Sequence, residues 1–578
     1  MIVVSIRAAT LSIATVCTAL VMSTALVAQT PRPAPGAAPP ARDAVGPAAT
    51  GTGRLRGRIV HAGTTTPIRR AQVTLTGEQN LSRIVTTDAD GRYEISDLPA
   101  GRFTMTAAKG GFVTTPYGQR RSFEPGRPVV LAAAQVLNQV DIGLPRGGVI
   151  VGRVLDRSGE PAIGATISVE RYQYAPDGQR RLTRVATAAA GTDDRGAFRA
   201  FGLTPGEYVV SANMRQLPQF PGTIASGAPV VGNLQTYFPG TPSAADAQPI
   251  VLEAGEEASV QFSMVSGRLA NVAGTILDSS GRPAAGADIM LTTSSPNGTA
   301  SGRGIGSAAA EGTFSITRVP PGEHYVQVRL NPRPGGVTEP EVANVPIAAA
   351  GDNIDGLQIM TAPAIVANGH VEWEGDTPRT GAPTALRIGA TPADGRPGLL
   401  GLIGSADPNA TGVVGANSSF RIGGLSGSMH LAATGLPPQW ALKAIFAGAT
   451  EVTNTSVDAA SLAGVPLRVV LTDKTTELTG TVRDATGAAV TEFVVVILPE
   501  EPLEGAAATR YTRAIRADVK GAFQVRGLPA GRYIVTAVPG LEPGSEWDPA
   551  FQASVRNGAR RFTLEDGQSL TLAVDLLP

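Results

Sequence analysis

Hydrophobic and polar residues alternate along short stretches of this chain, and Gly, Pro and Asp separate one stretch from the next. In residues 92–98, RYEISDL, and again in residues 101–108, GRFTMTAA, apolar residues recur at every second position. A period of two sends these side chains to one face of a β-strand. Segments of this kind recur from residue 54 onwards. The pattern therefore predicts an all-β fold built from many short strands.

One phrase occurs four times. It reads TDADGRYEISDLPAGRFTMTA from residue 87, DDRGAFRAFGLTPGEYVVSA from 193, AEGTFSITRVPPGEHYVQV from 310 and DVKGAFQVRGLPAGRYIVTA from 518. We expect each copy to be a β-hairpin, with glycines adopting the backbone angles that its turns require. The phrase then carries shape and no chemistry. The structural turn glycines are Gly91, Gly101, Gly196, Gly206, Gly312, Gly322, Gly521 and Gly531.

A second phrase precedes the first in each unit. It reads GRVLDRSGEPAIGATISVE at 152–170 and GTILDSSGRPAAGADIMLT at 274–292, with more divergent copies from residues 57 and 480. A degenerate unit begins at residue 369, and there Ser418 stands where the other units have a turn glycine. Units of about 100 residues are large enough to bury their own cores. The sequence thus predicts five tandem β-sandwiches, at residues 54–145, 146–265, 266–362, 363–473 (degenerate) and 474–578.

The paired phrases, G-x-V-x-D-x-x-G-x-P-x-x-G-A and D-x-x-G-x-F-x-x-x-x-L-P-x-G-x-Y-x-V-x-A, resemble the carboxypeptidase regulatory-like domain. The resemblance is good in the first, second, third and fifth units and weak in the fourth. It implies a transthyretin-like sandwich, related to immunoglobulin-like folds and grouped with starch-binding-like domains. It also implies an accessory module without catalysis, of the kind found in tandem in exported bacterial proteins.

The first 53 residues have a different composition. Arg7 precedes an apolar run, residues 8–27, and small residues before Gln29 offer a cleavage site, so we expect residues 1–28 to be a signal peptide. An uncleaved membrane anchor, or lipidation at Cys17, the only cysteine, is the alternative. Residues 29–53 are rich in Pro and Ala and are expected to be a disordered spacer. The mature chain is then exported to the periplasm or the medium, without a transmembrane segment.

Charge and composition exclude some partners. Lys and Arg total 48 and Asp and Glu total 48, so the net charge is zero. Nucleic-acid binding needs a clustered positive field, and we expect no nucleic-acid partner. The 69 glycines and 45 prolines fit a chain with many turns.

Catalytic motifs are missing from the sequence. None of the histidines, at positions 61, 324, 370 and 430, begins an H-x-x-E motif, which argues against a catalytic zinc site. His324 and His430 occupy the position that an aromatic residue fills in the other units. The Asp-rich segments at 88–91 and 193–194 could suggest calcium, but apolar rings follow where further ligands should stand, and turns are preferred. We expect a non-enzymatic protein with no metal and no cofactor.

Candidate binding residues lie in the connections before the closing strands, which differ most between units. These connections place aromatic rings among Pro, Gly and polar residues, and the candidates are Tyr117, Tyr237, Phe238, Trp440 and Trp547. The rings either stack on sugars or fold back onto the sandwiches. The sequence accordingly predicts a structural or interaction scaffold of the cell envelope or extracellular space, whose partner is an envelope protein or a polysaccharide. The alternative is a carbohydrate-binding protein that uses these aromatic loops.

Overall fold

The computed structural model describes most of the chain from residue 51 to residue 577. Residues 1–50, which comprise the predicted signal peptide and most of the predicted spacer, lie outside the described residues. Within residues 51–577 the description omits 78–80, 120–125, 186–190, 215–229, 294–300, 333–339, 378–385, 394–410, 438, 504 and 519.

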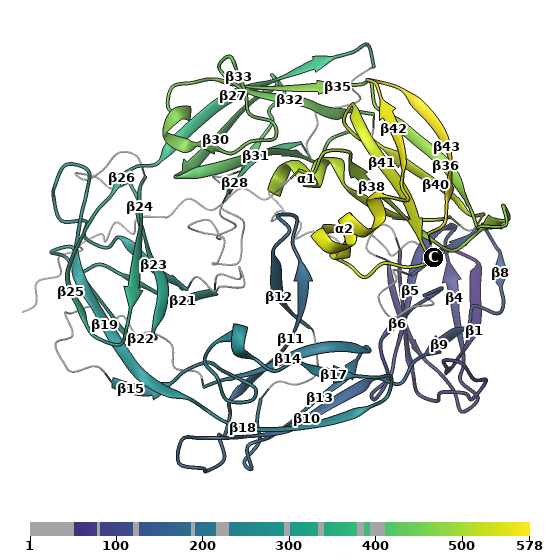
Figure 1. The fold of residues 1–578 in the computed structure, drawn as a ribbon, viewed down its shortest axis with the longest axis horizontal. Coiled ribbons are helices and arrows are strands. Elements are labelled where there is room, and N and C mark those ends of the chain that lie inside the picture. Colours follow the sequence, from purple (N-terminus) through teal and green to yellow (C-terminus); the bar gives the residue numbers. More distant parts are fainter. Residues whose placement is uncertain are drawn as a thin grey trace, which may run out of the picture. The chain divides into compact units, whose positions relative to one another are not determined.

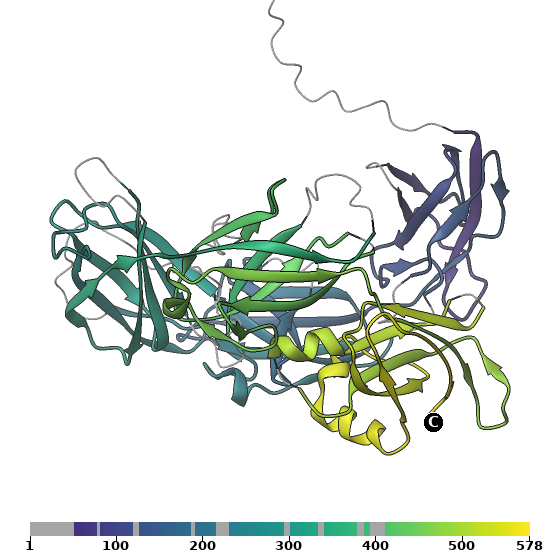
Figure 2. The ribbon, with the colours of Figure 1, turned by 90° about the horizontal axis from the view of Figure 1, so that it is seen from above.

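Five hydrophobic cores follow one another along the chain. Each core draws on one continuous stretch of sequence, and the strands around it have neighbouring colours in Figures 1 and 2. This confirms the prediction of an all-β chain of tandem sandwiches, which we number 1 to 5 by their cores. The cores run from Leu55 to Leu144, Ile150 to Met264, Ala270 to Ile359, Ala367 to Leu471 and Leu478 to Val574.

All five sandwiches share one sheet arrangement. The first strand lies inside one sheet, where it pairs antiparallel with the strand after the turn glycine and parallel with the closing strand. In sandwich 2, for example, β10 pairs with β13 and with β18. The second sheet contains the next long antiparallel pair, β11 with β14 in the same sandwich. The alternating side chains of both sheets meet in the core between them.

Apart from β15, the elements of sandwiches 1 and 2 form four sheets, with orders β4-β1-β8/β9, β3-β2-β5-β6/β7, β13-β10-β18 and β12-β11-β14-β16/β17. Sandwich 1 contains β1(Gly53–His61), β2(Gln72–Gly77), β3(Ser82–Thr86), β4(Arg92–Leu98), β5(Gly101–Ala108), β6(Thr115–Pro116), β7(Val129–Leu131), β8(Val136–Leu137) and β9(Ile142–Leu144). Sandwich 2 contains β10(Gly148–Leu155), β11(Thr166–Tyr174), β12(Arg180–Arg184), β13(Ala197–Leu203), β14(Gly206–Asn213), β15(Val230–Asn233), β16(Thr236–Tyr237), the 3-10 helix η1(Ala244–Asp246), β17(Ile250–Leu252) and β18(Glu257–Ser263).

The sheets of sandwiches 3 and 4 have the orders β15-β19-β22 plus β25, β21-β20-β23-β24-β26, β30-β27-β35-β32-β33 and β29-β28-β31-β34. Sandwich 3 contains β19(Ser266–Leu277), β20(Asp288–Thr293), β21(Ser301–Ser307), β22(Thr313–Val319), β23(Gly322–Leu330), β24(Glu341–Ala349), β25(Ile354–Met360) and β26(Ala362–Pro363). Sandwich 4 contains β27(Ile365–Glu374), β28(Arg387–Pro392), β29(Thr411–Val413), β30(Ser419–Leu425), β31(Ser428–Thr434), β32(Ala441–Ala447), β33(Thr450–Glu451), β34(Val457–Asp458), η2(Ala459–Leu462) and β35(Leu467–Thr472).

Sandwich 5 carries both α-helices of the described chain. Its sheets have the orders β37-β36-β40 plus β43 and β39-β38-β41-β42. Its elements are β36(Glu477–Arg483), β37(Ala489–Val490), β38(Val494–Pro499), α1(Gly505–Tyr511), β39(Arg513–Arg516), β40(Ala522–Arg526), β41(Gly531–Val538), η3(Ser545–Trp547), α2(Pro549–Arg556), β42(Arg560–Leu564) and β43(Ser569–Asp575).

The recurring phrase is not a β-hairpin, and that sequence prediction was wrong. Of the two strands in the first copy, β4 pairs with β1 in one sheet and β5 pairs with β2 in the other. The L-P-A-G turn between them therefore carries the chain across the core from sheet to sheet. Alternation shows which face of a strand is buried, but it does not show which strand is its neighbour.

The sandwich boundaries predicted from the sequence remain a prediction. Strand β15, which lies between β14 and β16 in the chain, pairs antiparallel with β19 from Val230↔Leu269 to Asn233↔Ser266. This ladder crosses the predicted boundary between residues 265 and 266. A segment that precedes the boundary thus contributes a strand to a sheet of sandwich 3.

Candidate functional site

The aspartates of the repeated turns bind their own backbone. The Asp193 carboxylate accepts N–H bonds from Arg195 at 2.9 Å and Ala197 at 2.8 Å, and the Asp518 carboxylate accepts them from Lys520 and Ala522. These bonds lower the pKa of both aspartates. The same two-bond pattern, to the residues two and four positions later, recurs at Asp88, Asp156, Asp278 and Asp484.

These contacts explain the turn carboxylates without a bound cation. In each pair one oxygen, Oδ1, accepts both backbone hydrogens. Within the described residues, no group of three or more His, Cys, Asp or Glu side chains is placed to hold a metal ion.

The first glycine of each repeated phrase has the left-handed conformation that its turn requires. Gly91, Gly196, Gly312 and Gly521 have φ between 70° and 75°. A Cβ on Gly196 would also lie 2.4 Å from the carbonyl oxygen of Val154. Ser418 takes this position in sandwich 4 with a φ of 62°, which costs a non-glycine residue conformational energy.

The second glycine is less uniform, and the sequence interpretation needs a correction at Gly101. Gly206 and Gly322 have φ of 145° and 137°, and Gly531 has φ of 159°, close to extended backbone. Gly101 is not among the described residues with positive φ, and a Cβ there would meet only the Phe103 ring, at 3.7 Å. Its backbone does not require glycine.

A third glycine, at the start of each unit, faces an aromatic ring. Cross-strand partners are Gly57↔Tyr93, Gly152↔Phe198, Gly274↔Phe314, Gly369↔Phe420 and Gly480↔Phe523. A Cβ on Gly152 would lie 2.4 Å from the Phe198 ring. The missing side chain makes room for a core aromatic residue, and the ring in turn covers the glycine. This pairing was not predicted from the sequence, although both positions can be identified in the aligned phrases.

Buried tyrosine and histidine side chains hold the crossover turn. Tyr208 donates its hydroxyl to the Thr204 carbonyl at 2.5 Å, and Tyr533 donates to the Pro529 carbonyl at 2.6 Å. His324, which is 1% exposed, places Nε2 2.7 Å from the Pro320 carbonyl at the same position. Because a carbonyl only accepts, Nε2 carries a proton, and Nδ1 lies 3.1 Å from the Thr293 hydroxyl. His324 therefore has a structural role.

Three of the five candidate aromatic residues pack into the protein. Trp440 is 6% exposed and lies in the core of sandwich 4, where its ring meets the Trp373 ring edge-on at 4.7 Å. Tyr237 is 8% exposed and packs in a small cluster on the outer face of sandwich 2. Phe238 packs against the core of sandwich 2, with its ring 6.2 Å from that of Phe262. Burial of these rings favours the interpretation that the loops fold back.

The other two candidates are half-buried. Tyr117 packs against the core of sandwich 1, and Trp547 lies in η3. The charged neighbours that the sequence suggested for Tyr117, Arg120 and Arg121, lie outside the described residues. The structure thus does not bring the five candidates together into one site.

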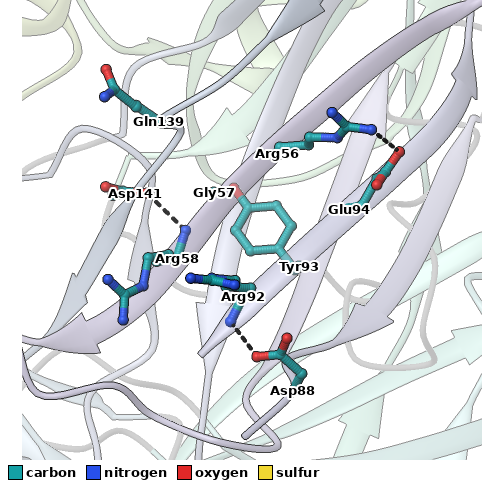
Figure 3. A pocket seen from close by; sticks show the side chains of 9 residues that line it. All are labelled: Arg56, Gly57, Arg58, Asp88, Arg92, Tyr93, Glu94, Gln139 and Asp141. Atoms are coloured by element: carbon teal, nitrogen blue, oxygen red, sulfur yellow. Dashed lines mark hydrogen bonds and ion pairs between the residues drawn. The ribbon is translucent and has the colours of Figure 1, made fainter. Parts of the chain in front are cut away.

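Sandwich 1 has a depression of about 590 Å³ over β1, β4 and the closing segment (Figure 3). Leu55 of β1 pairs with Leu137, whereas Ile59 pairs with Ile142. Between these two pairs the closing segment therefore has one residue more than β1. Without a Cβ, Gly57 lets the Val140 carbonyl approach. The depression is lined by Arg56, Gly57, Arg58, Asp88, Arg92, Tyr93, Glu94, Gln139 and Asp141.

Most polar groups of the depression are bound within the sandwich. Tyr93 donates to the Val140 carbonyl at 2.5 Å, and burial raises the pKa of its phenol. The Asp141 carboxylate accepts a hydrogen bond from the backbone N–H of Arg58 at 2.7 Å. It thus takes the place of the backbone carbonyl that would accept this N–H in a regular ladder. Arg56 lies 3.1 Å from Glu94, and this hydrogen bond lowers the pKa of the carboxylate.

The arginine that follows the unit glycine also has a repeated structural contact. The Arg58 guanidinium donates to the Asp90 carbonyl at 3.2 Å, and Arg153 donates to the Arg195 carbonyl at 3.0 Å in sandwich 2. Both carbonyls belong to the turn before the glycine. The depression has no nucleophile paired with a base among its lining residues. The contacts of Arg58, Tyr93 and Asp141 hold the turn and the closing segment in place.

Comparison with protein families assigns the first sandwich. Residues 54–145 match the model described as "Carboxypeptidase regulatory-like domain". Sandwich 1 is thus similar to the carboxypeptidase regulatory-like domain over its whole length. The unit glycine, its facing aromatic ring and the parallel closing strand recur in the other four sandwiches, which repeat the same design beyond the matched range.

Solved structures share only a distant likeness with the chain. The Bacillus anthracis TIE protein is 15% identical with a TM-score of 0.15, over 54% of this chain and 51% of that one. A streptococcal ancillary pilin is 11% identical with a TM-score of 0.20, over 54% and 99%. Two B repeat units of the Staphylococcus aureus collagen binding protein are 12% identical with a TM-score of 0.12, over 73% and 99%.

The chain thus spans about half the length of the TIE protein. TM-scores this low say nothing about function. No curated protein matches the chain. Within the described residues, no helix has the length and apolar character needed to cross a membrane.

Proposed function

We propose that this chain is an exported, non-catalytic modular scaffold of five tandem sandwiches. The observation that carries the proposal is the use of the repeated polar residues. The turn aspartates and the buried tyrosines each bind backbone groups of their own sandwich. A motif that is repeated because it builds a fold leaves function to the surfaces that differ between copies.

Export is the second part of the proposal and comes from the sequence. Residues 1–28 have the composition of a signal peptide, followed by a Pro- and Ala-rich spacer at 29–53. The spacer would separate the sandwiches from the surface near which the N-terminus lies. The partners that we propose are proteins or polysaccharides of the cell envelope.

Two measurements test the proposal. N-terminal sequencing of the chain recovered from periplasm and medium should give a start at Gln29, and an uncleaved chain that stays in the cytoplasm would contradict export. Force spectroscopy of the mature chain should show five separate unfolding events, each releasing about 100 residues, or roughly 330–360 Å of extended chain. A single unfolding event for the whole chain would contradict the modular scaffold.

A further inference from the structure

The second sheet of sandwich 1 has an outer face made largely of threonine, which we call the threonine face. Side chains of β2, β3 and β5 alternate between the core and this face, and those that point outward are mostly uncharged. Outward positions on the three strands are Gln72, Thr74, Thr76, Ser82, Ile84, Thr86, Arg102, Thr104, Thr106 and Ala108.

The register arranges these side chains in rows across the strands. Thr76 lies between Ser82 on β3 and Thr104 on β5, and its hydroxyl is 3.4 Å from that of Thr104. Thr74 lies between Ile84 and Thr106 in the next row. Neighbouring strands are about 4.8 Å apart, and successive outward residues on a strand are about 6.8 Å apart. The face is thus a regular array of hydroxyl and methyl groups.

The array is open, in contrast to the corresponding faces of two other sandwiches. Ile84 is 59% exposed on β3, and Val130 is 66% exposed on the adjoining β7. In sandwich 5 the corresponding face packs under α2, where Val555 covers it. In sandwich 2 an apolar cluster that includes Tyr237 and Ala244 of η1 lies on that face. Only the first of these three faces offers its side chains to a partner.

The chemistry of the face favours one class of partner. Each threonine offers a donor, an acceptor and a methyl group, which suits the mixed hydroxyl and C–H surface of a sugar ring. Threonine is stiff about χ1, so the array loses little side-chain entropy on binding. Arg102 is the one charged residue of the array, and an anionic partner would find little complementary charge.

We infer that the threonine face binds an uncharged polysaccharide. The inference rests on the proposed function in one respect, because a glycan of the envelope or medium is met only by an exported chain. It differs from the carbohydrate-binding alternative drawn from the sequence, since it places the binding surface on β2, β3 and β5. The loop aromatics are not required.

The test is retention of the full mature chain on insoluble cellulose, chitin and starch granules, with polygalacturonate as the anionic comparison. We expect retention on at least one uncharged glycan. The double variant Thr74→Val/Thr106→Val keeps the shape of the face and removes two hydroxyls, and it should weaken retention at least tenfold. Thr74→Glu/Thr106→Glu should abolish retention. The matched control is Thr563→Glu, at an exposed position of β42 in sandwich 5, and it should bind as the unaltered chain does.

Each contrary result overturns the inference. The first is no retention on any of the three uncharged glycans. The second is retention of both double variants equal to that of the unaltered chain. The third is retention confined to polygalacturonate. Dimers that Thr74→Glu/Thr106→Glu dissociates, measured by sedimentation, would assign the face to a second copy instead. Cleavage before Gln29 and the five unfolding events would be unaffected by any of these outcomes, so the proposed scaffold and this surface can fail separately.

Discussion

The second sheets of sandwiches 1 and 5 have the same strand pairing, but the outer face of one is polar and open and that of the other is apolar and covered. On β2 and β5, Thr74 pairs with Thr106, and on β38 and β41, Val496 pairs with Thr536 at the corresponding position. The first face is open to solvent, whereas Val496 is 0% exposed beneath α2. The sequences QVTLT and VVVIL show this difference directly, because a strand covered on both faces is apolar at every position.

The inner faces of the two sandwiches have not diverged in this way. Both keep a unit glycine opposite an aromatic ring, Gly57 with Tyr93 and Gly480 with Phe523. The comparison teaches that the inner face specifies the fold and that the outer face is where the copies are free to differ. Equivalent substitutions in the shared interior should therefore have similar effects in the two sandwiches. Substitutions at equivalent positions of the outer faces should differ in their effects.

The largest effect is expected from Gly57→Ala and Gly480→Ala. The new Cβ would lie 2.0 Å from the Val140 carbonyl oxygen in sandwich 1 and 2.1 Å from the Leu572 carbonyl oxygen in sandwich 5. The closing strand must move away, at a cost of about 3 kcal/mol, the upper end for overpacking. Hydrogen exchange of peptides from β1 and β36 measures the loss in each sandwich. Gly101→Ala is the control and should leave exchange unchanged; equal effects at Gly101 and Gly57 would contradict the steric argument.

The next effect separates the two outer faces. Val494→Thr places a hydroxyl opposite Val538 in the apolar cluster beneath α2 and should destabilise sandwich 5 by about 1–3 kcal/mol. Thr74→Val, the reverse change at the open face, should alter the stability of sandwich 1 by no more than about 0.5 kcal/mol. Exchange protection of β38 and β2 reports the two results separately. If both variants are neutral, α2 does not exclude water from the face of sandwich 5.

A smaller effect of opposite sign is expected at Thr536. Its side chain is 2% exposed on the covered face, and its hydroxyl oxygen has no hydrogen-bond partner among the residues that the structure describes. Thr536→Val removes this unsatisfied group with little change in volume and should stabilise sandwich 5 by about 1 kcal/mol. Thr106→Val at the corresponding open position should be neutral. Urea unfolding monitored by exchange of β41 and β5 peptides makes the comparison, and destabilisation by Thr536→Val would show that its hydroxyl is bound in solution.

Sequence pattern predicted the fold class and the tandem cores, because alternation and turn residues act locally. It did not predict that the recurring phrase crosses between sheets, since Leu98 to Gly101 can turn the chain either into a hairpin or across a core. Strand pairing is decided by the distant partners β1 and β2.

The candidate site was harder to predict for a related reason. Trp440 stands in a Pro-rich segment that suggested a loop. The residues after it nevertheless form β32, which pairs with β35, and the Trp440 ring packs in the core of sandwich 4. The outward threonines of β2 and β5 were visible in the sequence. Their meeting in one array depends on the register between strands that are separated by residues 78–100.

The smallest expected effect is a dependence on pH in sandwich 5. Hydrogen bonds from the backbone N–H groups of Ala522 and Lys520 lower the pKa of Asp518, and bonds from Thr486 and Ala488 lower the pKa of Asp484. A carboxylate whose pKa is lower in the folded state contributes stability above its unfolded pKa of about 3.9 and loses it as the pH falls through the folded value.

The melting temperature of sandwich 5 should thus be constant from pH 7 to about pH 5 and fall below about pH 4. Asp518→Asn keeps an oxygen acceptor but cannot titrate, so its melting temperature should fall less steeply between pH 4 and pH 2.5. Thr74→Val in sandwich 1 is the control and should follow the pH profile of the unaltered chain. If Asp518→Asn retains the full acid dependence, the turn carboxylate does not contribute to the acid response, and the remaining dependence belongs to other groups such as Glu477, whose pKa is lowered by hydrogen bonds from Arg526 and Gln524.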